Sequence, residues 1–451
     1  MKRHGSLSAG ALALCALAFC AVCICSARGS AELDVRTFGA KGDGATKDTA
    51  AVQRALDACA KAGGGRVTLP PGTYLVGSVY LGDRTELHLQ EGATLLGSPD
   101  LADYNASDAY PQNWCSAKEG WSAKHLVLAL EKQGVSITGR GVIDGNARSF
   151  FGDKPQLVGK VCWRDGGVNA RVAGVRPGQE IVFVECRDVA VRDVTLRDMS
   201  CWSCFFHGCE NVTVGGVTVR NDVTYLNTDG IDVDSCRNVE IGDCDIVTGD
   251  DAITVRGSSA RLKNSAMACE NVRISNIVCR VSADGIRVGV GSGTIRNVRV
   301  SDMKVERGGR GIHVQCFFSN AHPKGVDISE VSFERISIRD VVEAVNVGVG
   351  GTGDAKLENI RFRKVDAEGD SPSLVCGSRA VRAKGVAFTD CSFNVARPAA
   401  AKGEVFRIER ADAVSFDNCE FRLNGVPAAD VRSVFSVRYA AMPTVTQVRL
   451  P

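Results

Sequence analysis

Three aspartates stand one repeat apart near the middle of the chain. Residues 227–231 read Asn-Thr-Asp-Gly-Ile and contain Asp229, while residues 249–253 read Gly-Asp-Asp-Ala-Ile and contain Asp250 and Asp251. Carboxyl groups held close together raise each other's pKa, so one keeps a proton near neutral pH while another is ionised. Such a set could perform acid–base chemistry, in which one group donates a proton and another activates water.

The two motifs belong to a repeated pattern of one charged, one small, one branched apolar and one polar residue followed by valine. The copies lie 22, 33, 26 and 33 residues apart, at Asp229, Asp251, Asp284, Arg310 and Glu343. A unit that recurs at this interval and is built from alternating β-branched residues indicates a solenoid of strands. We therefore predict an all-β fold in which the strands stack as a parallel β-helix.

Stacking would bring matching positions of successive coils to within about 4.8 Å of each other. One file of side chains would then hold Asp229, Asp251, Asp284 and Arg310, with Asp250 beside it. A second file would hold Asp232, Thr254, Arg287 and His313. Stacked carboxylates must be compensated or used, which favours a functional site over the alternative, a solvated strand edge with acidic turn residues. Asp284 would raise the neighbouring pKa values further unless an arginine neutralises it.

The composition excludes some partners. The 451 residues carry 54 basic and 52 acidic side chains, and the net charge of +2 does not suggest binding to nucleic acid or to an anionic membrane. Residues 1–31 resemble a signal peptide, with a basic start, an apolar run over 9–24 and small residues at the expected cleavage site. We expect a secreted or periplasmic protein with no membrane span in its mature chain; an uncleaved N-terminal anchor is the alternative.

Residues 32–451 are expected to form one domain, because repeat proteins grow by adding coils. Residues 32–98 predict an entry module in which 35–38 form a strand and a helix from Asp48 or Thr49 caps the open end of the solenoid. Residues 99–180 are less periodic and contain three tryptophans that could stack on sugars or pin a loop. Regular coils with the active site follow over 181–370, and C-terminal coils with a cap over 371–451.

Cysteines and asparagines recur at the predicted corners of the coils. Four cysteines share one register and predict a vertical stack of packed thiols, with disulfides between some coils as the alternative: Cys186, Cys209, Cys236 and Cys269. Four asparagines predict a ladder of hydrogen bonds from coil to coil: Asn211, Asn238, Asn271 and Asn297. Cys201 and Cys204 lack the second pair that a zinc site requires.

These motifs resemble those of glycoside hydrolase family 28, the polygalacturonase family, over nearly all of residues 32–451. The family signature is Asn-Thr-Asp, Gly-Asp-Asp, Gly-His-Gly and Arg-Ile-Lys. The first two stand intact at 227–229 and 249–251, whereas Ala-Asp-Gly at 283–285 and Gly-Ile-His at 311–313 replace the others. The resemblance implies a single-stranded right-handed parallel β-helix that works as an inverting hydrolase, without a cofactor or metal, and as a monomer. The changed motifs leave two interpretations of its pectin-like substrate open: Arg287 and Arg310 could bind an anionic sugar from a different angle, or the substrate could be a neutral or mixed glycan and not plain homogalacturonan.

The resemblance also implies roles for individual residues. Asp250 would be the acid, while Asp229 and Asp251 would hold and deprotonate the water. An inverting pair should lie about 6.5–9.5 Å apart, which residues one coil apart but offset sideways can satisfy. Substrate contacts are expected from Asn227, Asp284, Arg287, Arg310 and His313. Two alternatives remain open: a calcium-dependent polysaccharide lyase on the same aspartates and a glycan-binding β-helix without catalysis.

Overall fold

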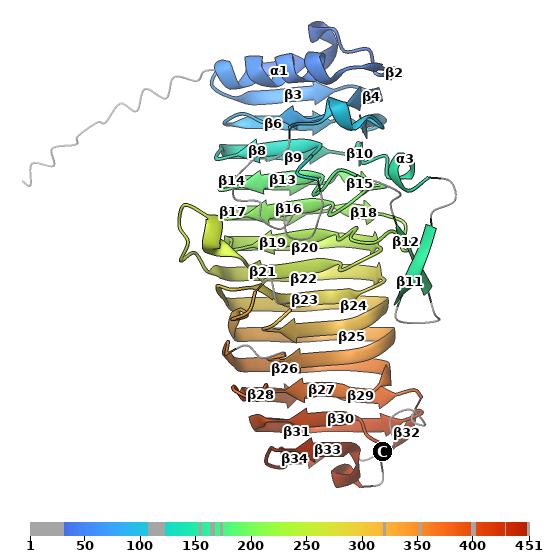
Figure 1. Ribbon diagram of the computed structural model, residues 1–451, viewed down its shortest axis with the longest axis vertical. Coiled ribbons are helices and arrows are strands. Elements are labelled where there is room, and N and C mark those ends of the chain that lie inside the picture. The colour runs from blue at the N-terminus through green and yellow to red at the C-terminus, as the bar shows by residue number, and fades with distance from the viewer. Residues whose placement is uncertain are drawn as a thin grey trace, which may run out of the picture.

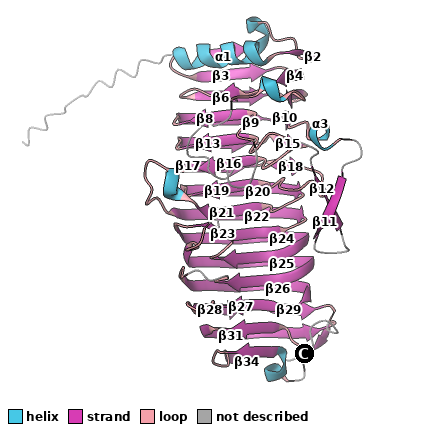
Figure 2. Ribbon diagram, viewed as in Figure 1, coloured by secondary structure: helices cyan, strands magenta, loops and turns pink. Residues whose placement is uncertain are grey.

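The structure is a computed structural model that describes residues 31–106, 122–152, 156–162, 167–171, 175–318, 322–350, 354–397, 403–428 and 430–448. The described chain forms one elongated stack of coils that begins under helix α1 (Thr49–Lys61) and ends at strand β34 (Thr444–Val448) (Figure 1). Nearly all of the stack is strand (Figure 2). No helix among the described residues is long and apolar enough to cross a membrane.

The strands pair in parallel along three faces of the stack. The first face, which carries the aspartates, contains β5 (Val79–Tyr80), β8 (Val127–Leu130), β13 (Ile181–Val184), β16 (Cys204–His207), β19 (Ile231–Asp234), β21 (Ile253–Gly257), β23 (Asp284–Gly291), β27 (Ser373–Cys376), β30 (Phe406–Glu409) and β33 (Phe435–Arg438). The second contains β1 (Ala31–Asp34), β3 (Gly65–Leu69), β6 (Thr85–Leu89), β9 (Gln133–Gly139), β14 (Arg187–Arg192), β17 (Glu210–Gly215), β28 (Ala383–Thr389) and β34. The third contains β2 (Asp43–Lys47), β4 (Gly72–Val76), β7 (Ala93–Gly97), β10 (Val142–Asp144), β15 (Thr195–Arg197), β18 (Thr218–Arg220) and β29 (Ser392–Val395).

Longer strands bend from one face to the next and tie the faces together. They are β20 (Arg237–Thr248), β22 (Cys269–Val281), β24 (Thr294–Gln315), β25 (Asp327–Gly348), β26 (Leu357–Ser371) and β31 (Ala411–Leu423). The remaining elements are β11 (Gln156–Cys162), β12 (Gly167–Arg171), β32 (Val426–Pro427), α3 (Arg148–Phe151) and the short 3-10 helices η1 (Val35–Phe38), η2 (Leu101–Asp103), η3 (Ser259–Arg261) and η4 (Val431–Val434).

The core is a set of apolar files that run along the inside of the stack. The branched residue of each predicted repeat pairs with its counterpart in the next coil: Ile231 with Ile253, Ile253 with Ile286, and Ile286 with Ile312. All are fully buried, and each such side chain stabilises the fold by about 1.5–3 kcal/mol. Because alternate residues point outward, this register fixes the polar files on the outer surface. The all-β parallel fold predicted from the repeat is confirmed.

The corners carry the predicted asparagine ladder. Asn238 Nδ2 donates to Asn211 Oδ1 over 3.1 Å, Asn271 to Asn238 over 3.0 Å and Asn297 to Asn271 over 2.7 Å. All four residues have φ values between 52° and 58°, a left-handed conformation that asparagine adopts more readily than most residues do. The same residue type therefore makes the turn and bonds it to its neighbours.

The stacked cysteines are buried free thiols. Each points at a carbonyl oxygen of the preceding coil: Cys209 Sγ lies 3.2 Å from Phe183 O, and Cys236 Sγ lies 3.4 Å from Phe206 O. The packed-thiol interpretation is confirmed for these residues, because the thiols donate backwards along the stack and form no disulfides with one another. Cys201 and Cys204 are also free and buried, in separate apolar clusters.

The N-terminal end differs from the prediction in two details. Helix α1 lies at the end of the stack, as expected (Figure 1). Residues 35–38, however, form η1 and not a strand, so that prediction was wrong. Asp34 Oδ1 accepts the Arg36 N–H over 2.8 Å, and this local bond draws the chain out of the extended conformation. Asp48 does not cap α1 through its side chain; it accepts the N–H groups of Lys41 and Gly42 at 2.7 and 2.9 Å.

Two other predictions fall on residues that are not described. The predicted signal, 1–31, lies outside the described residues except for Ala31, which is the first residue of β1. Trp114, Trp121 and Trp163 also lie outside them. Within 99–180, the described β11 and β12 pair as an antiparallel hairpin separate from the stack, and Figure 1 shows it at the side of the coils.

Candidate active site

The aspartates stand where three successive coils enter the first face. Asp229 lies two residues before β19, Asp251 two residues before β21, and Asp284 is the first residue of β23. Backbone hydrogen bonds fix the register, since Gly230 N donates to Asp251 O and Ala252 N donates to Asp284 O, both over 2.9 Å. Gly230 must be small, because a Cβ there would lie 2.4 Å from the carbonyl oxygen of Ala252.

Asp229, Asp250 and Asp251 form a compact carboxyl cluster. One oxygen of each lies within 4.8 Å of one oxygen of each of the others. Asp229 and Asp251 are only 4% and 2% exposed, whereas Asp250 is half-buried. One oxygen of the expected acid and one of the expected base therefore lie closer together than the 6.5–9.5 Å expected between whole carboxyl groups. The stacking of coils sets this spacing.

Backbone N–H groups orient Asp250. Its Oδ2 accepts from Asn227 N over 3.2 Å and its Oδ1 from Asp251 N over 3.0 Å. Asn227 has φ 57°, which turns its N–H toward the carboxyl group. The side-chain Oδ1 of Asn227 accepts from Arg176 Nη2 over 3.1 Å. The amide that was expected to contact substrate is therefore bound by Arg176. Sequence reasoning missed Arg176, because it follows a stretch that shows no repeat.

Crowding and burial change the protonation of the cluster. Burial, followed by the charge of Asp251, raises the pKa of Asp250 to about 7. Burial and then Asp250 raise the pKa of Asp229 well above its usual value. Burial also raises the pKa of Asp251, but the Arg287 guanidinium opposes that rise. Asp250 can therefore hold a proton near neutral pH, and Asp251 is the member with a cation beside it.

The remaining predicted residues form a charged network behind the cluster. Arg287 Nη1 lies 2.9 Å from Asp251 Oδ2. Asp284 N donates to Asp251 Oδ1 over 2.9 Å, and Asp284 Oδ2 lies 2.6 Å from His313 Nδ1. Arg310 Nη1 lies 3.3 Å from Asp284 Oδ1, and Arg310 Nε lies 3.0 Å from Glu343 Oε2. Four of the five predicted substrate contacts therefore belong to this network: Asp284, Arg287, Arg310 and His313. The fifth, Asn227, is bound to Asp250 through its backbone N–H.

Burial limits what this network can touch. Asp284 and His313 are 1% and 3% exposed. Burial alone would raise the pKa of Asp284, but His313 and the two arginines hold it well below its usual value. Asp284 nevertheless still raises the pKa of Asp250 and of Asp251, as expected of an aspartate that the arginines do not fully neutralise. The guanidinium groups of Arg287 and Arg310 bind protein carboxylates. From the sequence, an anionic sugar was the suggested partner of both.

A second buried charge cluster adjoins the site on the same face. Asp232 and Asp234 are fully buried, and Arg256 lies 3.9 Å from Asp232 Oδ1 and 3.7 Å from Asp234 Oδ2. The Arg256 guanidinium also lies 4.4 Å from the centre of the Trp202 ring. Sequence reasoning placed Asp232 in a file but assigned it no role, and it missed Asp234 and Arg256. Alternation of outward residues along β19 and β21 could have found both.

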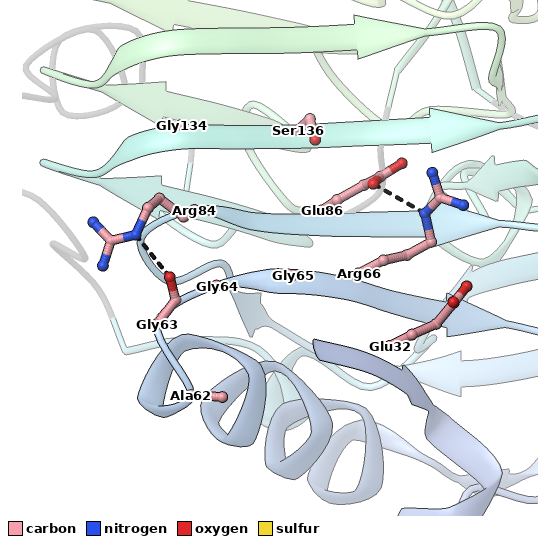
Figure 3. A pocket seen from close by; sticks show the side chains of 10 residues that line it. All are labelled: Glu32, Ala62, Gly63, Gly64, Gly65, Arg66, Arg84, Glu86, Gly134 and Ser136. Carbon is pink, nitrogen blue, oxygen red and sulfur yellow. Dashed lines mark hydrogen bonds and ion pairs between the residues drawn. The ribbon is translucent and has the colours of Figure 1, made fainter. Parts of the chain in front are cut away.

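A cavity of about 810 Å³ lies away from the aspartates, where α1 meets the coils of β3, β6 and β9 (Figure 3). Both arginines that line it are already paired: Arg66 Nε lies 3.0 Å from Glu86 Oε2, and Arg84 Nε donates to the carbonyl oxygen of Gly63 over 2.7 Å. We assign this cavity no chemistry.

Two family models match parts of the chain. The family model "Glycosyl hydrolases family 28" matches residues 102–404, and "Rhamnogalacturonase A/epimerase, pectate lyase-like" matches residues 33–134. The chain is 28% identical over 290 residues to a probable polygalacturonase of Vitis vinifera, covering 62% of this chain and 55% of the relative. It is 30% identical over 256 residues to an exo-poly-alpha-D-galacturonosidase of Dickeya chrysanthemi, covering 49% of this chain and 41% of the relative. The chain thus spans about half the length of these curated relatives.

The structural comparison agrees with the fold. The exopolygalacturonase from Thermotoga maritima superposes with a TM-score of 0.72 at 22% identity, covering 88% of this chain and 93% of that one. At this identity the likeness shows the fold alone. The family model, in contrast, spans both aspartate motifs and more than half of the chain. The protein therefore belongs to the glycosyl hydrolases of family 28.

Proposed function

We propose that this protein is a glycoside hydrolase that cleaves a pectin-like polysaccharide by acid–base catalysis. The observation that carries the proposal is the compact cluster of Asp229, Asp250 and Asp251, in which Asp250 has a pKa of about 7. Family membership supports the same reaction class. We also propose that the protein is exported. The composition of residues 1–31 supports export, and a polysaccharide substrate would be met outside the cytoplasm.

Each aspartate has a role that follows from its surroundings. Asp250 is the acid: it carries a proton near neutral pH and is less buried than its neighbours, so it can protonate the leaving glycosidic oxygen. Asp251 is the base, because Arg287 stabilises its ionised form. Asp229, whose pKa is raised well above its usual value, orients the water.

The spacing of the cluster suits a bound water. A water that accepts or donates hydrogen bonds of about 2.7–2.8 Å can bridge two oxygens up to about 5.5 Å apart. The oxygens of Asp229 and Asp251 lie within 4.8 Å of each other, so one water can contact both. In this arrangement water attacks the sugar directly and no carboxylate needs to do so. We therefore propose that the anomeric configuration is inverted.

The raised pKa of Asp250 gives the reaction a basic limit. The acid must be protonated, so kcat/KM should fall as pH rises through about 7, the pKa of Asp250. The measurement is a profile of kcat/KM from pH 4 to 9 on one oligosaccharide. A profile that stays flat to pH 9 would contradict the assignment of Asp250 as the acid.

The substrate follows from the relatives and from the charges around the site. The relatives named above act, by their names, on galacturonans, whose sugars carry carboxylates. In this chain Arg287 and Arg310 already bind protein carboxylates. A pectic polymer in which the residue at the aspartates is not a free galacturonate therefore fits the site better than plain homogalacturonan does.

The direct test is incubation of the purified protein with homogalacturonan, rhamnogalacturonan, xylogalacturonan and neutral galactan, with new reducing ends counted. We expect release from at least one of these polymers, most from a substituted one. Proton NMR during the first minutes should show the anomer opposite to that of the cleaved bond. Appearance of the retained anomer would make one aspartate a nucleophile.

The same incubation decides between the alternatives. An unsaturated product that forms only with added calcium would identify a lyase, with the three aspartates as oxygen ligands. Binding of a polymer without release of reducing ends from any member of the panel would identify a glycan-binding protein and overturn the hydrolase proposal.

A further inference from the structure

The first face continues past the aspartates to a second, smaller cavity. Its volume is about 170 Å³, and its lining includes Arg310, Glu343, Ser371, Pro372, Leu374 and Arg407. Resting on the function proposed above, we propose that this cavity is a distal sugar subsite that binds a uronate residue of the same glycan chain, with Arg407 as its specificity-determining cation.

The register places the cavity on the line of the active site. In one file Asp284 pairs with Arg310, Arg310 with Glu343, and Glu343 with Ser371. In the other file Arg287 pairs with His313, His313 with Asn346, Asn346 with Leu374, and Leu374 with Arg407. Four coil steps of about 4.8 Å separate Arg287 from Arg407, which is about 19 Å. A glycan that crosses the aspartates along the stack therefore reaches Arg407 only when it is several sugars long.

In the opposite direction along the same face the file is apolar. The file that contains Asp232 continues toward the N-terminus through Phe205, Val182 and Leu128. These three side chains are buried in an apolar cluster with Trp202. Toward the C-terminus the side chains of the second file become more exposed to solvent: Asn346 and Leu374 are half-buried, and Arg407 is exposed. A polar chain is therefore directed from the aspartates toward the C-terminal coils.

The lining has the two kinds of surface that a sugar residue needs. Leu374, which is half-buried, offers apolar contact to the C–H face of a ring, while Glu343 and Ser371 can bond its hydroxyl groups. Arg310 is held in place by Glu343 and Asp284. Glu343 is fixed in turn by Asn346, whose Nδ2 donates to its Oε2 over 2.9 Å.

Arg407 supplies the charge that favours a uronate. It pairs with Glu404 through Nε at 2.9 Å, and its side chain is 52% exposed. A surface pair of this kind is weak, so it can be exchanged for a sugar carboxylate. A guanidinium presents two further nitrogens in a planar fork that matches a carboxylate. The cavity therefore distinguishes a uronate from the corresponding neutral sugar.

The test compares Arg407→Ala with the parent protein on uronate-containing oligomers of two to eight residues, prepared from the polymers of the panel above. Calorimetry in the Asp250→Asn background measures binding without turnover, and kinetics in the active enzyme measure kcat and KM. Loss of a charge-assisted hydrogen bond should weaken binding of the long oligomers, and raise their KM, by about 10- to 100-fold. The shortest oligomers, and long oligomers whose carboxyl groups have been reduced to alcohols, should bind both proteins equally. The kcat should not change.

Arg361→Ala is the matched control, because Arg361 is an exposed arginine of β26 that pairs with Glu330 at 3.0 Å on the second face. It should leave binding of all oligomers unchanged. Equal effects of Arg407→Ala on short and long oligomers, no effect on either, or no binding of any oligomer would each overturn the subsite. If the active enzyme cleaves nothing but long oligomers still bind through Arg407, the subsite stands and the hydrolase proposal fails.

Discussion

Replacement of Asp250 by asparagine should lower kcat by roughly 10²–10⁴-fold, the contribution that a positioned general acid usually makes. The amide has nearly the same shape, and its single oxygen can still accept one of the two N–H groups, those of Asn227 and Asp251, that hold the carboxyl group in place. It cannot release a proton to the leaving oxygen. The kcat should therefore collapse while KM changes little, and the basic limit of the pH profile near pH 7 should disappear from the residual rate.

The matched control for this variant is Asp193→Asn. Asp193 is an exposed turn residue with φ 63°, a conformation that asparagine adopts equally well. Both variants should keep the circular dichroism spectrum and the Tm of the parent protein. If Asp250→Asn kept more than about a tenth of the parent kcat, Asp250 would not be the acid. A loss of less than about tenfold is smaller than the contribution expected of a general acid.

Replacement of Arg287 by methionine should damage both stability and catalysis. The guanidinium lies 2.9 Å from the buried Asp251 carboxylate and 3.9 Å from Asp284. Removal of one partner from a buried ion pair usually costs about 3–5 kcal/mol of unfolding free energy, because the other charge stays buried and uncompensated. Asp251 can escape part of this cost by taking up a proton, so the destabilisation should be larger at high pH than at low pH.

The same substitution should shift the acidic limit of activity. Arg287 opposes the rise in the pKa of Asp251, so its loss raises that pKa further. The base is then protonated up to a higher pH, and below the new limit kcat/KM falls about tenfold for each unit of increase in the pKa. Urea unfolding at two pH values and a pH profile of kcat/KM measure the two effects. Arg299→Met, on an exposed position of β24, should change neither; an unshifted acidic limit in Arg287→Met would contradict Asp251 as the base.

The repeat allowed much of the fold to be predicted, because local periodicity carries the information. Ile231, Ile253, Ile286 and Ile312 recur with the side-chain alternation of a strand, and stacking is the arrangement that buries all of them. The alignment of these residues also aligned Asp251, Asp284 and Arg310 correctly. The entry segment was less predictable, since one hydrogen bond from the Arg36 N–H to Asp34 was enough to change a strand into η1.

The sequence by itself therefore determined the parallel β-fold, the family and the grouping of the three aspartates at one place on the stack, because all of these depend on residue type and spacing. Only the tertiary structure decided the separation of the carboxyl groups, the pairing of Arg287 and Arg310 with protein carboxylates, and the presence of Arg176 and Arg256 beside the site. These features are set by the directions in which side chains of neighbouring coils point and by how deeply those side chains are buried. Both depend on contacts between residues that are about 20–50 positions apart, the range of one repeat.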